Sequence, residues 1–119
     1  MLSKGNCFDA IAIDIINRLR VDKCFIGSAA ISADFGMSIQ KTSAIPFFNA
    51  VMDSSKRKTG LFPKEKIGFD SIVSISPAER LDMLITDWDV LEEELDLFRE
   101  KGIEVIVVEK EQGSIQMER

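Results

Sequence analysis

The sequence contains no histidine, so it lacks the most common catalytic base and a frequent metal ligand. A serine or cysteine nucleophile would have no imidazole to activate it. Its two cysteines, Cys7 and Cys24, lie far apart without the spacing of a zinc site, and each is interpreted as a small buried apolar residue. We therefore expect no metal, no cofactor and no catalytic residues of these kinds. A serine–lysine pair stays open, although nothing marks one.

Positive charge is also scarce, because 15 lysines and arginines face 20 aspartates and glutamates, a net charge of −5. The one basic cluster is Lys56–Lys58. Proteins that bind nucleic acid usually present a basic face, because contacts with phosphates supply most of the affinity. We expect that this chain alone does not bind DNA.

Long apolar runs are missing too. No stretch approaches the roughly 18 apolar residues of a membrane-spanning helix, and the N-terminus does not resemble a signal peptide. Neither a P-loop nor a GxGxxG fingerprint is present. These absences favour a cytoplasmic protein without a membrane partner and without a known nucleotide motif.

Hydrophobic periodicity, in contrast, is clear and predicts helices that alternate with strands. Helices are expected at 7–20, 44–56 and 89–101, and strands at 21–26, 59–62, 71–75, 81–86 and 103–108. Strand–helix–strand order at these spacings requires parallel crossovers. The sequence therefore predicts an α/β domain, a mostly parallel sheet with flanking helices, over residues 1–109, followed by a charged, frayed tail at 110–119.

Local signals refine these boundaries. Ser43 is expected to cap the second helix, and Asp89 with Glu92 to form a capping box at the third. The buried stripes of the first and third helices are predicted to be Phe8, Ile11, Ala12, Ile15 and Leu19, and Leu91, Leu95 and Phe98. Residues 27–32 are expected to form a loop of small residues.

Ligands of parallel sheets bind at the carboxyl ends of the strands, here the loops after Ile26, Phe62 and Thr86. The small-residue loop 27–32 offers backbone N–H groups that could hold an anion. Either Lys64 or Lys66 could reach the same side. Asp87 and Asp89 are interpreted as a turn residue and a helix cap rather than as catalytic carboxylates.

An ordered set of landmarks resembles a known family. The landmarks are Val21–Ser28, Ile31-Ser32, Gly36–Ser38, the helix 44–56, Lys66–Phe69 and Leu84–Asp87. Together they resemble the C-terminal half of the effector-sensing domain of DeoR-type bacterial transcriptional regulators. The resemblance covers about residues 5–109. This sensor is similar in fold to ribose-5-phosphate isomerase, glucosamine-6-phosphate deaminase and CoA transferases.

The resemblance implies a module that senses a phosphorylated sugar or a related small-molecule effector and forms a homo-oligomer, without catalysis. It implies ligand-binding residues Gly27, Ser28, Ala29, Ala30 and Lys66. Lys56 also fits the family's Asp-x-Ser-Lys by letters, in Asp53–Lys56, but that segment lies in the expected helix. We therefore prefer Lys66, with Pro63 and Glu65 in place of the usual Asp and Ser.

The family's winged helix-turn-helix and the first half of its sensor have no counterpart here, so we expect a fragment or a shortened gene product that contacts DNA only through a helix-turn-helix outside this chain. The edge and apolar face of a halved sheet would favour self-association.

Two alternative functions stay open. An isomerase- or deaminase-like enzyme fragment is disfavoured because no carboxylate follows the strand 21–26. An interaction domain that has lost its ligand site is the other.

Overall fold

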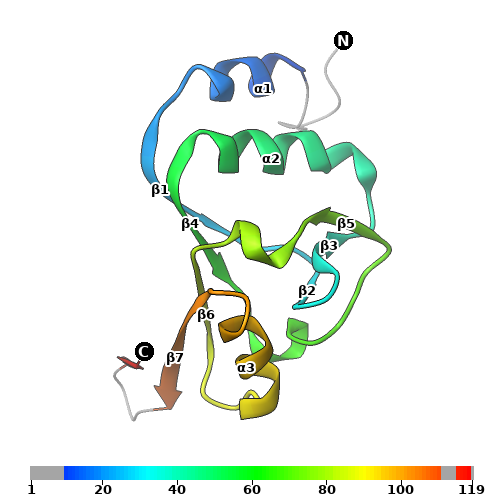
Figure 1. The fold of residues 1–119 in the computed structure, drawn as a ribbon. Coiled ribbons are helices and arrows are strands. Elements are labelled where there is room, and N and C mark those ends of the chain that lie inside the picture. The colour runs from blue at the N-terminus through cyan, green and yellow to red at the C-terminus, as the bar shows by residue number, and fades with distance from the viewer. Residues whose placement is uncertain (1–9, 111–114, 119) are drawn as a thin grey trace.

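The computed structural model describes residues 10–110 and 115–118, and its main element is a five-stranded sheet (Figure 1). The strand order is β1-β4-β6-β7-β8, formed by Val21–Ile26, Ser55–Leu61, Met83–Asp87, Glu104–Lys110 and Ile115–Glu118. Strands β1, β4, β6 and β7 run parallel, whereas β8 is antiparallel to β7. The expected α/β architecture with a mostly parallel sheet is confirmed.

A second, smaller sheet has the order β2-β3-β5 and is antiparallel. Its strands are Ala30–Ser32, Gly36–Ile39 and Val73–Ser76. The expectation that 27–32 is entirely loop was wrong, because Ala30 to Ser32 pair with β3 and Ala30 is buried. Gly36 makes the tight connection possible: its φ of 80° is in the left-handed region, and a Cβ there would meet the carbonyl of Ser76.

Within the described residues, three α-helices accompany the sheets: α1 at Ala10–Asn17, α2 at Ile45–Asp53 and α3 at Glu92–Arg99. Short 3₁₀ helices lie at Thr42–Ala44 (η1), Lys64–Lys66 (η2) and Ala78–Arg80 (η3). Pro46 falls in the first turn of α2, where its missing N–H costs no helical hydrogen bond. Gly102, with φ of 85°, follows the end of α3 as expected for a helix C-terminus.

Both predicted side-chain caps were wrong. Helix α2 begins directly after η1, with Ala44 as its N-cap residue, and Ser43 makes no cap. Helix α3 has Leu91 as its N-cap residue, without a capping side chain. Leu91 is therefore 68% exposed instead of buried. Leu95 and Phe98, the other two residues of that predicted stripe, are buried as expected.

Helix α1 also departs from expectation. It lies beside α2 (Figure 1), where the hydroxyl of Ser54 donates a hydrogen bond to the carbonyl of Ile16 at 2.7 Å. The predicted buried stripe is turned away from this contact, since Ile11, Ile15 and Leu19 are all exposed. Asn6, Cys7 and Phe8 lie outside the described residues. At the other end of the chain, the expected frayed tail contains β8, which pairs with β7.

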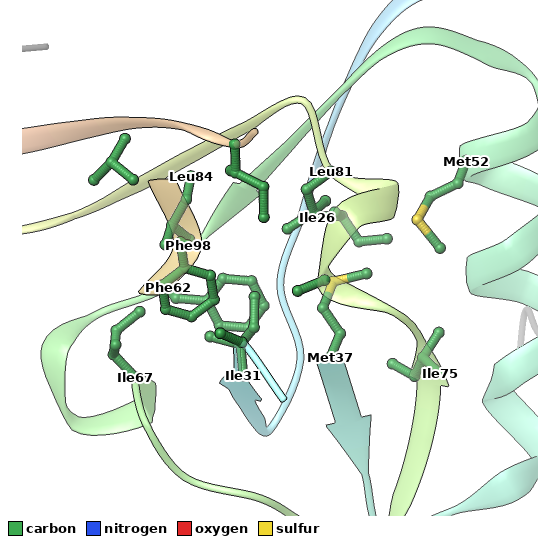
Figure 2. Packing of buried hydrophobic residues seen from close by; sticks show 14 of the residues in the cluster. Ile26, Ile31, Met37, Met52, Phe62, Ile67, Ile75, Leu81, Leu84 and Phe98 are labelled. Carbon is green, nitrogen blue, oxygen red and sulfur yellow. The ribbon is translucent and has the colours of Figure 1, made fainter. Parts of the chain in front are cut away.

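The hydrophobic core lies between the large sheet, the small sheet, α2 and α3. Figure 2 shows Ile26 and Leu84 of the large sheet together with Ile31 and Met37 of the small sheet and Phe98 of α3. Met52 of α2 also belongs to this cluster and is fully buried. Cys24 is buried in it as a free thiol, as predicted.

Alternation along the parallel strands gives the large sheet two distinct faces. The core face carries Cys24, Ile26, Gly60, Leu84, Thr86, Val105 and Val107. The open face carries Val21, Lys23, Phe25, Arg57, Thr59, Leu61, Met83, Ile85, Asp87, Glu104, Ile106 and Val108. Among the described residues, no side chain of the open face belongs to the hydrophobic core cluster.

Candidate functional site

Three loops meet at the carboxyl end of the parallel strands, and we call residues 27–29, 62–66 and 87–89 together the carboxyl rim. The loop after β1 touches the end of β4, since a Cβ on Gly27 would lie 2.9 Å from the carbonyl oxygen of Leu61. The loop after β4 joins β6 through the hydrogen bond from Phe62 N–H to the Ile85 carbonyl, 3.1 Å. The topology therefore brings the three predicted loops to one edge of the sheet.

The first loop is short because β2 begins at Ala30. Gly27 and Ala29 are exposed and Ser28 is half-buried. The Ser28 hydroxyl donates to the Ala30 carbonyl at 3.0 Å, which holds the turn in place. Within 10–110 and 115–118, the backbone N–H groups of Ser28 and Ala29 have no hydrogen-bond partner. Ala30 itself is buried and paired with Ser38, so its side chain faces the core rather than the rim.

Lys66 ends the 3₁₀ helix η2, on the side of the rim nearest the first loop. The next residue, Ile67, is buried and forms a parallel bridge with Ile31. The following N–H, that of Gly68, donates to the Ile31 carbonyl at 2.8 Å. These two contacts hold Lys66 close to strand β2. Its side chain is exposed and has no ion-pair partner within the described part of the chain.

Lys64 differs from Lys66 in being held by two carboxylates. Its N–H donates to Asp87 Oδ2 at 2.9 Å, and its ammonium group forms an ion pair with Asp89. The hydrogen bond and the charge of Asp89 raise the pKa of Lys64 above its ordinary value. The charge of Lys64 is therefore already paired with a carboxylate, whereas the Lys66 ammonium group has no ion-pair partner in the described part of the chain.

The roles predicted for Asp87 and Asp89 were incomplete. Asp89 was interpreted as a helix cap, but α3 begins at Glu92 and Asp89 binds Lys64 instead. Sequence reasoning missed both carboxylates as organisers of the rim. A signal was available in the sequence. The two aspartates directly follow the strand β6, and the neighbouring strand β4 is followed by a loop that contains lysines.

The competing lysine, Lys56, lies near the amino end of β4. Ser55 is the register partner of Val21, the first residue of β1, so this end of the sheet is opposite the rim. The Lys56 ammonium group lies 3.9 Å from the Asp22 carboxylate. The expectation that Asp53–Lys56 lies inside the helix was wrong, because α2 ends at Asp53 and Ser55 and Lys56 already belong to β4. The structure thus brings Gly27–Ala29 and Lys66 to one edge and leaves Lys56 at the other.

A hollow of about 620 Å³ lies next to this edge, between the small sheet and α3. It is lined by Ser32, Ala33, Asp34, Gly68, Asp70, Glu94, Leu97, Glu100 and Lys101. Four carboxylates and one lysine give this hollow a negative lining, which repels a phosphate. The hollow itself is therefore poorly suited to an anion.

Comparison with protein families decides what kind of domain this is. Residues 3–88 match the family model described as the DeoR C-terminal sensor domain. The chain belongs to the DeoR family. The match includes β1, β4, β6 and every residue of the carboxyl rim except Asp89. Sensor domains of the DeoR family are parts of transcriptional regulators that respond to small-molecule effectors.

A search of curated proteins found no match for this DeoR-type chain. In the part of the chain that the structure describes, no helix is long and apolar enough to cross a membrane. The same residues contain no group of three or more histidine, cysteine, aspartate or glutamate side chains arranged for a metal ion.

Proposed function

We propose that this DeoR-type sensor domain binds a phosphorylated sugar, or a related phosphorylated metabolite, at the carboxyl rim. The observation that supports it most is that the Lys66 ammonium group, which has no ion-pair partner among the described residues, lies on the same edge as the loop 27–29. The N–H groups of Ser28 and Ala29 would donate to the phosphate oxygens, and Lys66 would supply the opposite charge. Small side chains at 27–29 allow the phosphate to approach the backbone closely.

The same proposal includes self-association in the cytoplasm, with DNA contact left to a separate winged helix-turn-helix. The net charge of −5 supports this division, because an acidic domain is repelled by the phosphates of DNA. Effector binding would then act on DNA through the arrangement of the regulator's domains. In this proposal the chain performs no catalysis.

A thermal-shift series with sugar phosphates tests the ligand. A ligand at about 100 times its Kd stabilises a folded protein by about 2.7 kcal/mol, which moves the Tm measurably. We expect sugar phosphates to raise the Tm, and the matching unphosphorylated sugars to leave it unchanged. Inorganic phosphate alone should act weakly, since it lacks the sugar contacts.

Three variants test the location of the site. Lys66→Ala should abolish the shift, whereas Lys56→Ala, which removes another exposed lysine from the opposite edge, should retain it. Ala29→Asp should also abolish the shift, because it adds a negative charge to an exposed position of the loop. If Lys56→Ala abolished the shift and Lys66→Ala did not, the carboxyl rim would be the wrong site.

A further inference from the structure

The hollow between the small sheet and α3 carries an exposed apolar side chain as well as carboxylates. One of its walls is the outer face of α3 and its C-cap residue, where Glu94, Leu97 and Glu100 follow at intervals of three residues and so share one face. Leu97 is 45% exposed, whereas Leu95 and Phe98 are buried on the other side of the same helix. This wall therefore presents an apolar side chain between two carboxylates.

The opposite wall consists of the turn between β2 and β3 and the loop that follows Gly68. Asp34 belongs to the turn and Asp70 to the loop. The two segments are joined, because the Ser32 hydroxyl donates a hydrogen bond to Asp70 Oδ1 at 2.5 Å. Phe69, between Gly68 and Asp70 of the lining, is exposed. The second wall thus combines two carboxylates with a nearby exposed aromatic side chain.

The negative charge of this hollow is not compensated within the described residues. The carboxylates of Asp34, Glu94 and Glu100 have no ion-pair partner there. Lys101 is the cation of the lining, and its ammonium group lies 3.3 Å from a carboxylate oxygen of Glu79, a residue outside the lining. Like charges around one hollow repel one another, and a bound cation relieves that repulsion. The hollow therefore favours a cationic partner over a neutral or acidic one.

The spacing of the side chains on α3 matches a helical partner. At 1.5 Å per residue, Glu94 and Glu100 lie about 9 Å apart along the helix axis, with Leu97 midway between them. In a second helix, positions i and i+7 lie about 10.5 Å apart on one face, and positions i+3 and i+4 lie between them. A helix with cations at i and i+7 and an apolar residue between them complements this wall. Helices that bind in grooves use anchors at these same positions.

We propose that this hollow is a docking groove for a cationic amphipathic helix of a partner protein. The cations of the partner helix pair with Glu94 and Glu100, and its apolar side chain packs on Leu97. A free polyamine would supply the charge without an apolar side chain, so the exposed Leu97 favours a peptide. The α3 wall lies beyond residues 3–88, outside the matched sensor region, and the proposal is independent of the phosphate site at the carboxyl rim.

Titration of the full chain with two synthetic peptides tests the proposal, with binding followed by the anisotropy of a fluorophore on the peptide. The first peptide carries arginine at helical positions i and i+7 and leucine at i+3 and i+4. The second has the same composition in scrambled order. We expect the patterned peptide to bind at least about tenfold more tightly than the scrambled peptide and than spermine. Its affinity should fall as salt is added, because exposed ion pairs are screened.

Variants of α3 test the individual contacts, and each has a matched control. Glu94→Gln and Glu100→Gln should each weaken the patterned peptide about fivefold, whereas Glu93→Gln, which removes an exposed carboxylate outside the groove, should not. Leu97→Ala should weaken it by at least about fivefold, whereas Leu91→Ala, at an exposed position just before α3, should not. Glutamine and alanine are good helix formers, so α3 should be retained, and circular dichroism verifies folding.

Several outcomes would overturn the docking groove. These are no binding of the patterned peptide, equal binding of the scrambled peptide or of spermine, and equal losses in the groove variants and their controls. Lys66→Ala should bind the patterned peptide as the native chain does, because it changes only the carboxyl rim. The groove variants should in turn keep the thermal shift expected with sugar phosphates, so the two proposals fail separately.

Discussion

The two faces of the large sheet carry comparable apolar side chains but have different surroundings. On the core face, Ile26 and Leu84 pack against the small sheet and α3 (Figure 2). One residue away on the same strands, Phe25 and Ile85 point to the open face and take no part in the core cluster of the described residues. The comparison teaches that hydrophobic sequence alone does not fix burial, because the neighbouring surface decides it.

The largest expected change in stability is that of Leu84→Ala on the core face, compared with the similar truncation Ile85→Ala on the open face. Leu84→Ala should lower the free energy of unfolding by about 2–5 kcal/mol, because Leu84 is fully buried and a cavity would remain. Ile85→Ala, on the half-buried open face, should lower it by about 1 kcal/mol. Urea unfolding at low protein concentration measures both. Equal losses would mean that the open face is packed within the monomer, and the comparison would break.

A smaller effect is expected at Thr86, a buried polar residue of the core face. Its hydroxyl has no hydrogen-bond partner among the described residues. Thr86→Val should raise the free energy of unfolding by roughly 1 kcal/mol, because an unpaired buried hydroxyl is replaced by a methyl group of similar shape. As a contrast, the buried Ser38 hydroxyl accepts the N–H of Ser71 at 2.8 Å, so Ser38→Ala should be destabilising. A loss of stability for Thr86→Val would show that its hydroxyl is bonded after all.

The smallest effect is expected at the ion pair of Lys64 and Asp89, which belongs to neither face. Both side chains are well exposed, so Asp89→Asn should leave stability at neutral pH unchanged. The pKa of Lys64 is raised from 10.5, chiefly by its hydrogen bond with Asp89. Any stabilisation by this pair is therefore present below pH 10.5 and is lost as pH rises through the raised pKa. Carbon-13 NMR of the Lys64 side chain should show its pKa falling in Asp89→Asn; an unchanged titration would contradict the pairing.

Much of the fold could be predicted from the sequence where local signals agree with tertiary packing. Leu95 and Phe98 follow helical spacing and are buried, and the strands on both sides of α3 form adjacent parallel neighbours. The alternation of helices and strands required a parallel sheet, and the family match agrees with the resemblance seen in the residues. Local pattern and global topology point to the same answer there.

The remaining differences have physical causes. The stripe of Ile11 and Ile15 is amphipathic in sequence, but burial depends on a partner surface that periodicity does not reveal. Asp89 and Glu92 match the sequence pattern of a capping box. In the structure, however, Asp89 forms an ion pair with Lys64 and does not cap α3. Strand β2 consists of only three residues, so its pairing with β3 rather than any local propensity defines it.

For the candidate site, topology could be predicted and chemistry only in part. Parallel connectivity was enough to expect the loops after β1, β4 and β6 at one edge, where the structure has them. Which lysine remains unpaired could not be predicted, because the partners of Lys64 come from a loop more than twenty residues away. The ligand-binding roles of Gly27, Ser28, Ala29, Ala30 and Lys66 stay predictions.

Fluorescence of Trp88 during titration with sugar phosphates tests the central claim most directly. Trp88 is the single tryptophan of the chain, is 51% exposed, and lies on the carboxyl rim between the two aspartates that hold Lys64. A phosphorylated sugar bound beside Lys66 should produce a saturable change in its emission, and Lys66→Ala should remove that change. A flat titration of the native chain, or an identical response in Lys66→Ala, would contradict the account.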